Sequence, residues 1–284
     1  MKTTRIKAPL ILTNENYYSQ EANREYFSVS QLKTFMACEE RAVAELDGMY
    51  ERPLTTSLLV GSYVDAHFSR ELDLFKAKNP QIFTKQGTLK SEFRQAEEII
   101  ARIERDKLAM ALLSGKTQQI FTGEIFGEPF KVKLDVLLDR EQVEDIVDQF
   151  PLLDCLLFSH GAIVDMKIMK DFAPIYKEGA GRLNFIESWQ YDLQGAIYQE
   201  IVRQNLGHRL PFLILGATKE TVTDIDLFHV PQALMDANLE LLEPNLPRYA
   251  ALKRKETMPE RCGTCGWCKE TKVLSSATWP EDFA

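Results

Sequence analysis

The stretch AIVDMKIMKDF places a carboxylate and an ammonium group two positions apart inside an apolar run. On a β-strand, residues two apart point to the same face. Asp165 and Lys167 therefore project together, while Val164, Met166 and Ile168 point the other way into the core. Burying charge is costly unless it is paired or bound to a metal. This pattern alone is consistent with an ion pair at a sheet edge, and further acids are needed before it indicates catalysis.

Two further acids lie in a predicted hairpin. Asp135 falls in KLDVLLD, on the second strand of the hairpin, and Glu124 lies on the first. Asp135, Asp165 and Lys167 converge if the hairpin and the later strand are neighbours. Two carboxylates at one point repel each other unless a cation lies between them, and hard oxygen ligands suit Mg²⁺ or Mn²⁺. Such an ion lowers the pKa of bound water and holds a phosphate oxygen, and Lys167 would either polarise the attacking water or stabilise the developing negative charge.

Two helical segments offer supporting side chains. His67 lies with Gly61 on a predicted helix in VGSYVDAHF. A lone histidine more commonly has a structural role, and a helical glycine usually permits close backbone approach. Gln194 and Tyr198 are four residues apart and share a helical face, where they either orient water and phosphate or form the polar rim of the core.

These motifs, in this order, resemble the PD-(D/E)xK nuclease superfamily. Within it the chain is similar to RecB-like and RecE-like exonucleases, and most of all to the phage-type exodeoxyribonuclease VIII, PDDEXK-like domain, over roughly residues 26–272. The resemblance implies a metal-dependent exonuclease that digests DNA ends in phage-type recombination. It implies metal ligation by His67, Asp135, Asp165 and the carbonyl of Met166, catalysis by Lys167, and supporting roles for Glu124, Gln194 and Tyr198.

One feature departs from the compact form of that motif. Asp135 and Asp165 are thirty residues apart (165 − 135), so the intervening insert must leave the sheet. The insert contains EDIVDQF, which resembles the strand but has no lysine; if it were the strand, Asp145 or Asp148 would replace Asp165. We expect the strand at 162–168, because only there does the lysine follow.

Three of the five cysteines cluster in RCGTCGWCK, at Cys262, Cys265 and Cys268. A tetrahedral ion or an iron–sulfur cluster needs a fourth ligand, for which Cys38 is the best candidate. One cysteine before the nuclease core and three after it resembles the layout of RecB-like nucleases that bind a [4Fe–4S] cluster. Zn²⁺ at the same thiolates, or no metal, remains an alternative. Cys155, in PLLDCLLF, is expected to be a buried, inert thiol.

Charge and composition limit the possible partners. The 284 residues include 45% hydrophobic and 27% charged residues, with a net charge of −8, which argues against a protein that coats nucleic acid by bulk positive charge. A narrow basic groove for DNA is expected instead, with phosphate contacts from Lys131, Lys133, Lys170, Lys177 and Arg182. A homo-oligomeric ring and a single-strand-annealing recombinase as partner are implied by the resemblance only. The sequence has neither a signal peptide nor a membrane-spanning run, which predicts a cytoplasmic protein.

Periodicity supplies the elements that must position these residues. Helices are predicted at 28–49, 55–75, 89–113, 185–206 and 231–255, a hairpin within 118–139, and strands at 161–169, 211–219 and 224–230. This order predicts an α/β fold of the restriction-endonuclease-like kind, a mixed sheet flanked by helices. Residues 1–27 are expected to be an irregular lead-in, and 28–284 the nuclease domain, with a Cys-rich segment at 258–272.

Two other functions remain open from the sequence. The first is a non-catalytic DNA-binding or assembly module that has kept the fold. The second is a zinc-stabilised regulatory protein in which the Asp-x-Lys pair is incidental. Metal binding at the acids would argue against the first, and iron at the cysteines would argue against the second.

Overall fold

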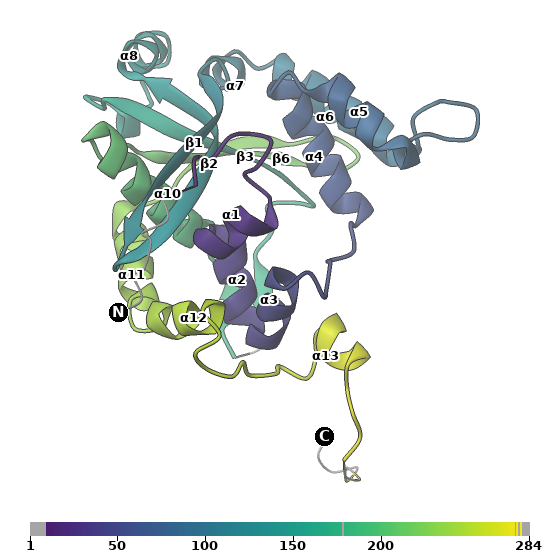
Figure 1. The fold of residues 1–284 in the computed structure, drawn as a ribbon. Coiled ribbons are helices and arrows are strands. Elements are labelled where there is room, and N and C mark those ends of the chain that lie inside the picture. The colour runs from purple at the N-terminus through teal and green to yellow at the C-terminus, as the bar shows by residue number, and fades with distance from the viewer. Residues whose placement is uncertain (1–9, 178, 276, 278, 280–284) are drawn as a thin grey trace.

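A five-stranded mixed sheet forms the centre of the protein in the computed structural model, which describes residues 10–177, 179–275, 277 and 279 (Figure 1). The strand order is β1-β2-β3-β6-β7, with β3 and β6 parallel and the other neighbours antiparallel. The strands are β1 (Lys116–Ile125), β2 (Glu128–Asp139), β3 (Gly161–Met169), β6 (Phe212–Thr218) and β7 (Ile225–His229), and β4 (Ile175–Lys177) pairs with β5 (Gly181–Leu183) in a separate hairpin.

Helices cover both faces of this sheet. Before the sheet come α1 (Gln20–Glu25), α2 (Val29–Ala37), α3 (Glu39–Leu46), α4 (Thr56–Phe68), α5 (Leu72–Lys78), α6 (Ser91–Glu104) and α7 (Lys107–Leu112). Between and after the strands come α8 (Arg140–Gln149), α9 (Phe185–Ser188), α10 (Tyr191–Leu206), α11 (Gln232–Leu242), α12 (Leu246–Lys253) and α13 (Gly266–Glu270), with single 3₁₀ turns at Pro80–Ile82 and Asp154–Leu156. No helix in the described part of the chain is long and apolar enough to span a membrane.

Each face of the sheet has its own apolar core. Ile163 of β3 packs in one core with α2, α3, α10, α11 and α12. Val164 and Met166 of the same strand pack in the other core with α4, α6, α7 and α8. This alternation is the one predicted for a strand with period two, and it directs Asp165 and Lys167 toward the α2–α10 side. The predicted fold class is confirmed.

Several predicted helices are divided into two. The helix expected at 28–49 breaks at Cys38, whose extended backbone (φ −168°) ends α2 and begins α3. The segments 55–75, 89–113 and 231–255 likewise each contain two helices, and in 185–206 a short α9 precedes α10. The lead-in expected to be irregular contains α1, and its residues 1–9 lie outside the described part of the chain.

The insert between the two aspartates leaves the sheet, as expected. EDIVDQF belongs to α8, which begins with a capping box formed by Asp139 and Gln142. Val143 and Ile146 are buried on this helix, whereas Asp145 and Asp148 are exposed. The alternative in which this segment supplies the catalytic strand is therefore excluded.

Candidate active site

The two aspartates face each other where β2 and β3 separate. The antiparallel ladder runs from Asp139–Gly161 to Val136–Val164, and the next position would pair Asp135 with Asp165. No backbone pairing is formed there; instead, Oδ2 of Asp135 accepts a hydrogen bond from the N–H of Met166 at 2.9 Å. The fork between the strands thus brings together two carboxylates that are far apart in the sequence.

A local irregularity of the hairpin turns Asp135 into this fork. Opposite Asp135 on β1 lies Gln118, whose φ of 54° is left-handed. The alternation of β2 changes at the same point, because Leu134 belongs to one core and Val136 to the other. In a regular strand these two residues would share a face. Because the alternation of β2 changes at Asp135, its carboxylate points into the fork and belongs to neither apolar core.

Asp165 is held by two neighbours. Its Oδ1 accepts a hydrogen bond from Nε2 of Gln194 at 2.6 Å, and its Oδ2 forms an ion pair with Nζ of Lys167. Gln194 reaches the strand because α10 packs closely on β6: a Cβ at Gly195 would lie 2.6 Å from Cδ1 of Phe212. Asp165 is 2% exposed, so it depends on these partners.

A third carboxylate comes from α4. Asp65 lines the same cavity as Asp135 and Asp165, and its Oδ1 lies 3.5 Å from Nε2 of Gln118. His67, the residue expected here, does not line this cavity; its Nε2 is 2.8 Å from Oε1 of Glu104 on α6. Residues two apart on a helix point in nearly opposite directions, so α4 can present only one of the two to the fork. The structure therefore brings Asp65 to the acids in place of His67.

The charges in the fork are unbalanced without a cation. Burial raises the pKa of Asp135 well above its usual value, and the neighbouring Asp165 raises it further. Burial also raises the pKa of Asp65. Burial alone would lower the pKa of Lys167, but attraction to Asp165 and Asp135 outweighs it and raises the pKa. Lys167 is therefore an ammonium ion, and it offsets only part of the negative charge.

The donor set fits a divalent cation. Oδ2 of Asp165 is buried beside the ammonium of Lys167, and hydrogen bonds occupy one oxygen each of Asp135 and Asp65. Carboxylate oxygens with free positions are the ligands that Mg²⁺ and Mn²⁺ prefer. Asp135, Asp165 and Asp65 could hold such an ion together, and the carbonyl of Met166 remains a predicted further ligand.

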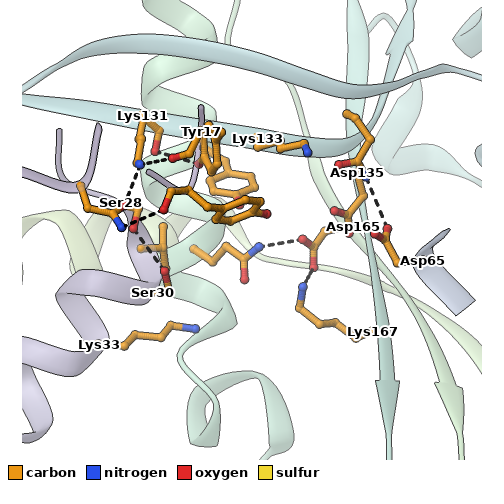
Figure 2. A pocket seen from close by; sticks show the side chains of 16 residues that line it. Tyr17, Ser28, Ser30, Lys33, Asp65, Lys131, Lys133, Asp135, Asp165 and Lys167 are labelled. Carbon is orange, nitrogen blue, oxygen red and sulfur yellow. Dashed lines mark hydrogen bonds and ion pairs between the residues drawn. The ribbon is translucent and has the colours of Figure 1, made fainter. Parts of the chain in front are cut away.

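A polar cavity of about 430 Å³ opens beside the acids (Figure 2). Lys33 of α2 and Lys133 of β2 line it, with Ser28 and Ser30 at the start of α2. Lys33 donates a hydrogen bond to the carbonyl of Trp189 at 2.7 Å, and burial together with the nearby Lys167 lowers its pKa to about 8. The cavity therefore places ammonium and hydroxyl groups next to three carboxylates, an arrangement suited to a phosphate ester.

The other predicted site residues differ in their positions. Gln194 and Tyr198 line the polar cavity, whereas Glu124 is exposed near the hairpin turn and its backbone bonds Gln204, so the structure does not bring it to the acids. Among the predicted DNA contacts, Lys133 lines the polar cavity, Lys170 and Arg182 are exposed, and Lys177 donates to the carbonyl of Ser188.

Lys131 does not have the position expected of a surface phosphate contact. It is 1% exposed and donates hydrogen bonds to the carbonyl of Tyr17 and to Oδ1 of Asn23, the latter at 2.8 Å. Burial lowers its pKa to about 8. Its ammonium holds the N-terminal segment against β2, so the expectation that it contacts DNA is corrected to a structural role at the wall of the cavity.

Sequence reasoning missed several residues around the acids. Asp65 had a signal in the sequence, since it is a carboxylate between the apolar residues Val64 and Ala66 of a predicted helix. Tyr17 and Tyr18 carry no pattern, and they reach the cavity only because the N-terminal segment folds across β2. The remaining residues missed are Ser28, Ser30, Lys33, Gln118, Trp189 and Tyr191.

Away from the acids, four cysteines gather at one point. The sulfurs of Cys38, Cys262, Cys265 and Cys268 all lie within 4.8 Å of one another, with Cys38 and Cys268 3.6 Å apart. Ligands 2.3 Å from a tetrahedral zinc ion are separated by about 3.8 Å. A four-iron cluster is larger and holds its cysteines further apart. The observed separations therefore fit a single ion better than a cluster.

Hydrogen bonds favour a thiolate at Cys262 but not at Cys268. The backbone N–H of Cys265 donates to Sγ of Cys262 at 3.3 Å, and the hydroxyl of Thr264 lies 3.6 Å from the same sulfur. Burial opposes ionisation, but these hydrogen bonds lower the pKa of Cys262 to about 5. Burial and the neighbouring sulfurs raise the pKa of Cys268 to about 12. Four thiolates are compatible only with a bound cation.

Comparison with known families identifies the domain around these sites. The sequence matches the model of a PDDEXK-like domain of unknown function (DUF3799) over residues 28–148 and 152–271. The chain belongs to this PDDEXK-like family. Its acidic fork lies within the first and second matched segments, and so do all four clustered cysteines.

A solved relative agrees with this assignment. The PDDEXK-like chain is 44% identical to a protein from Eubacterium rectale, described as a candidate exonuclease, whose crystal structure was determined at 2.19 Å resolution. The similarity covers 96% of this chain and 98% of the other, with a TM-score of 0.86. No curated protein matches the sequence. The chain therefore carries a nuclease-like domain, and the predicted superfamily is confirmed.

A matched pair on α4 of the PDDEXK-like chain separates the two candidate ligands. Asp65→Asn is expected to weaken Mg²⁺ binding by about 10- to 100-fold, because it removes a carboxylate from the fork. His67→Gln is expected to leave the affinity within about twofold, because His67 contacts Glu104 instead. Thermal shifts measured over a range of Mg²⁺ concentrations check both. Equal losses in the two variants would contradict the assignment of Asp65.

The cysteine group is expected to hold the C-terminal segment in place. Cys268 is the only residue of α13 that is buried, and Cys38 joins it to the α2–α3 boundary. An ion whose Kd is about a thousandfold lower than its free concentration stabilises the fold by about 4 kcal/mol. Loss of this ion in Cys38→Ser is therefore expected to lower the Tm by roughly 10 °C. The measurements are thermal unfolding and metal content, with Cys155→Ser as the control that retains both. A Cys38→Ser protein with full metal content and unchanged Tm would contradict this expectation.

Proposed function

We propose that the protein is a metal-dependent deoxyribonuclease that hydrolyses phosphodiester bonds at DNA ends. The observation that carries the proposal is the convergence of Asp65, Asp135, Asp165 and Lys167 at one fork, beside a cavity lined by lysines. The family and the solved relative support a nuclease, and that relative's description as a candidate exonuclease supports action at ends.

The chain's own residues divide the work of hydrolysis. Asp135, Asp165 and Asp65 would hold Mg²⁺ or Mn²⁺, which when bound supplies an activated water and a positive charge for a phosphate oxygen. Gln194 fixes Oδ1 of Asp165, and so it sets the orientation of that carboxylate. Lys167, protonated in this field of acids, lies where it can stabilise charge on the phosphate in the transition state.

The polar cavity is the proposed path of the DNA backbone. Lys33 and Lys133 would contact phosphates on one side of the scissile bond, and the hydroxyls of Ser28 and Ser30 would donate to them. The net charge of −8 limits this basic surface to a narrow region, and binding through its lysine–phosphate contacts is expected to weaken as the salt concentration rises. Lys170 and Arg182 are proposed as outer contacts, since both are exposed.

One assay tests this proposal directly. The purified protein with Mg²⁺ is expected to shorten linear duplexes that carry a 5′ or a 3′ label, to leave a closed circle intact, and to be inactive in EDTA. The time course of the two labels gives the direction of digestion. Nicking of the circle at the same rate would indicate an endonuclease, and no cleavage of any DNA would refute the nuclease proposal.

For the cysteines, we propose a structural zinc ion. The separations between the sulfurs support a single tetrahedral ion over the [4Fe–4S] cluster that the resemblance implied. Elemental analysis is expected to give one zinc per chain, without iron and without absorbance near 400 nm. The predicted recombinase partner, ring-shaped oligomer and cytoplasmic location remain predictions.

A further inference from the structure

A second cavity also reaches the acidic fork. Its volume is about 730 Å³, within the range of roughly 300–1,000 Å³ typical of small-molecule sites. Asp65, Asp135 and Lys167 line both this cavity and the polar one. A phosphate at the fork would therefore adjoin both chambers.

The walls of the second cavity have a different chemistry from those of the first. Trp189, Tyr191, Pro174 and Ile175 give it a largely apolar wall, whereas the polar cavity is lined mainly by charged, hydroxyl and amide side chains together with Tyr17, Tyr18 and Tyr198. Flat apolar walls suit a planar heterocycle, because a nucleobase stacks on an aromatic side chain whatever its sequence. The second cavity thus offers a base a more apolar wall than the first does.

Of the residues that line this cavity, Trp189 is the best placed to stack with a base. Its side chain is 56% exposed, and it forms no ring contact with any residue in the described part of the chain. Its backbone is nonetheless fixed: the carbonyl accepts a hydrogen bond from Lys33, and Gln190 beside it has a left-handed φ of 54°. An indole held at the mouth of a cavity, on a fixed backbone and without a partner, is suited to a ligand.

Polar groups at the rim complete the site. Lys219 contacts the hydroxyl of Ser57, and both line the cavity with the exposed Lys170. These groups lie in the same cavity as Trp189 and would face the sugar or the outer phosphate of a nucleotide. The cavity thus offers one nucleotide an aromatic wall, a cationic rim and the acids at its inner end.

We propose that this second cavity binds the terminal nucleotide of the DNA strand, unpaired, with its base stacked on Trp189. The inference rests on the proposed nuclease function, and it assigns the part of the DNA substrate that the second cavity binds. A base that enters this cavity leaves the stack of the duplex and its partner on the opposite strand, so the end of a duplex must open by at least one pair before cleavage.

The test compares ends with and without a terminal base. Two matched linear duplexes are used, one intact and one with an abasic site as its terminal nucleotide. Trp189→Ala is expected to lower kcat/KM for the intact duplex by roughly tenfold, whereas Trp189→Phe keeps most of the activity. On the abasic duplex, wild type and Trp189→Ala should cleave equally, because there is no base to stack. Trp279→Ala, which alters another exposed indole, is the matched control.

Equal losses on both duplexes, or no loss on either, would overturn the proposal. Wild type alone provides a further check, since it must itself prefer the intact duplex. A binding measurement separates this proposal from the nuclease function: in EDTA, a terminal 2-aminopurine should change its fluorescence on wild type but not on Trp189→Ala. If wild type shows this change yet cleaves no DNA, the base site stands and the nuclease proposal fails.

Discussion

Asp135→Asn is expected to abolish Mg²⁺-dependent cleavage, by about 10³-fold or more, while making the metal-free protein more stable. Asparagine keeps an oxygen for the N–H of Met166, so the fork retains its hydrogen bond. The variant loses a metal ligand, which removes activity. It also loses a charge that burial and Asp165 oppose, which relieves repulsion in the absence of metal.

The raised pKa of Asp135 determines how the stability of the metal-free protein changes with pH. The pKa of Asp135 is higher in the folded protein than in the unfolded chain, so the folded state holds the proton more tightly. Stability from this group is present near pH 4 and is lost as the pH rises through the folded pKa. In EDTA, the Tm of Asp135→Asn should exceed that of wild type by an increasing margin as the pH rises from about 4 through the folded pKa. Saturating Mg²⁺ should raise the Tm of wild type but not that of the variant.

The control for Asp135→Asn is Asp148→Asn. Asp148 is exposed on α8, in the segment that resembles the catalytic strand, and its replacement should change neither activity nor the effect of Mg²⁺. Thermal unfolding with and without Mg²⁺ and a DNA cleavage assay provide the readouts. Retained cleavage in Asp135→Asn, or a Tm in EDTA below that of wild type, would contradict the role given to this carboxylate.

Lys167→Met is expected to lower cleavage by about 10²–10³-fold without weakening Mg²⁺ binding. Methionine retains most of the side-chain volume but removes the ammonium that pairs with Asp165. The loss corresponds to that seen when one donor to a developing negative charge is removed. Because the acids then lack their cationic neighbour, Mg²⁺ should bind at least as tightly as in wild type.

Lys85→Met, an exposed substitution in the loop before α6, is the matched control and should be fully active. Mg²⁺ affinity from thermal shifts, measured beside cleavage rates, separates a catalytic role from a role in assembling the site. If Lys167→Met loses Mg²⁺ binding together with activity, then Lys167 organises the acids and does not act on the phosphate.

Much of the site follows from local periodicity. The alternation of apolar residues in GAIVDMKIM determines β3, and it places Asp165 and Lys167 on one face. The helical spacing of the segment after β5 likewise predicts that Gln194 and Tyr198 share a face. These relations involve neighbours in sequence or regular repeats, and they do not depend on the rest of the fold. That this face meets β3 depends on the packing of α10 on β6.

The choice between Asp65 and His67 required the packing of α4. Both lie on one helix two residues apart, and either could have faced the acids. The core formed by Val60, Tyr63 and Val64 fixes the rotation of α4 against α6 and β3, and this rotation sends His67 toward Glu104. Helix periodicity defines faces but not which face meets a distant strand.

The sequence by itself determined the nuclease-like strand, its acid–lysine pair, the hairpin acid and the spacing of the cysteines. Only the tertiary structure decided that β2 and β3 part at Asp135 and Asp165, that Asp65 joins them, and that two chambers of different chemistry meet there. The physical reason is that strand and helix patterns arise from contacts between near neighbours. A cavity forms where the packed elements leave space between them, so its shape and lining depend on all the elements around it.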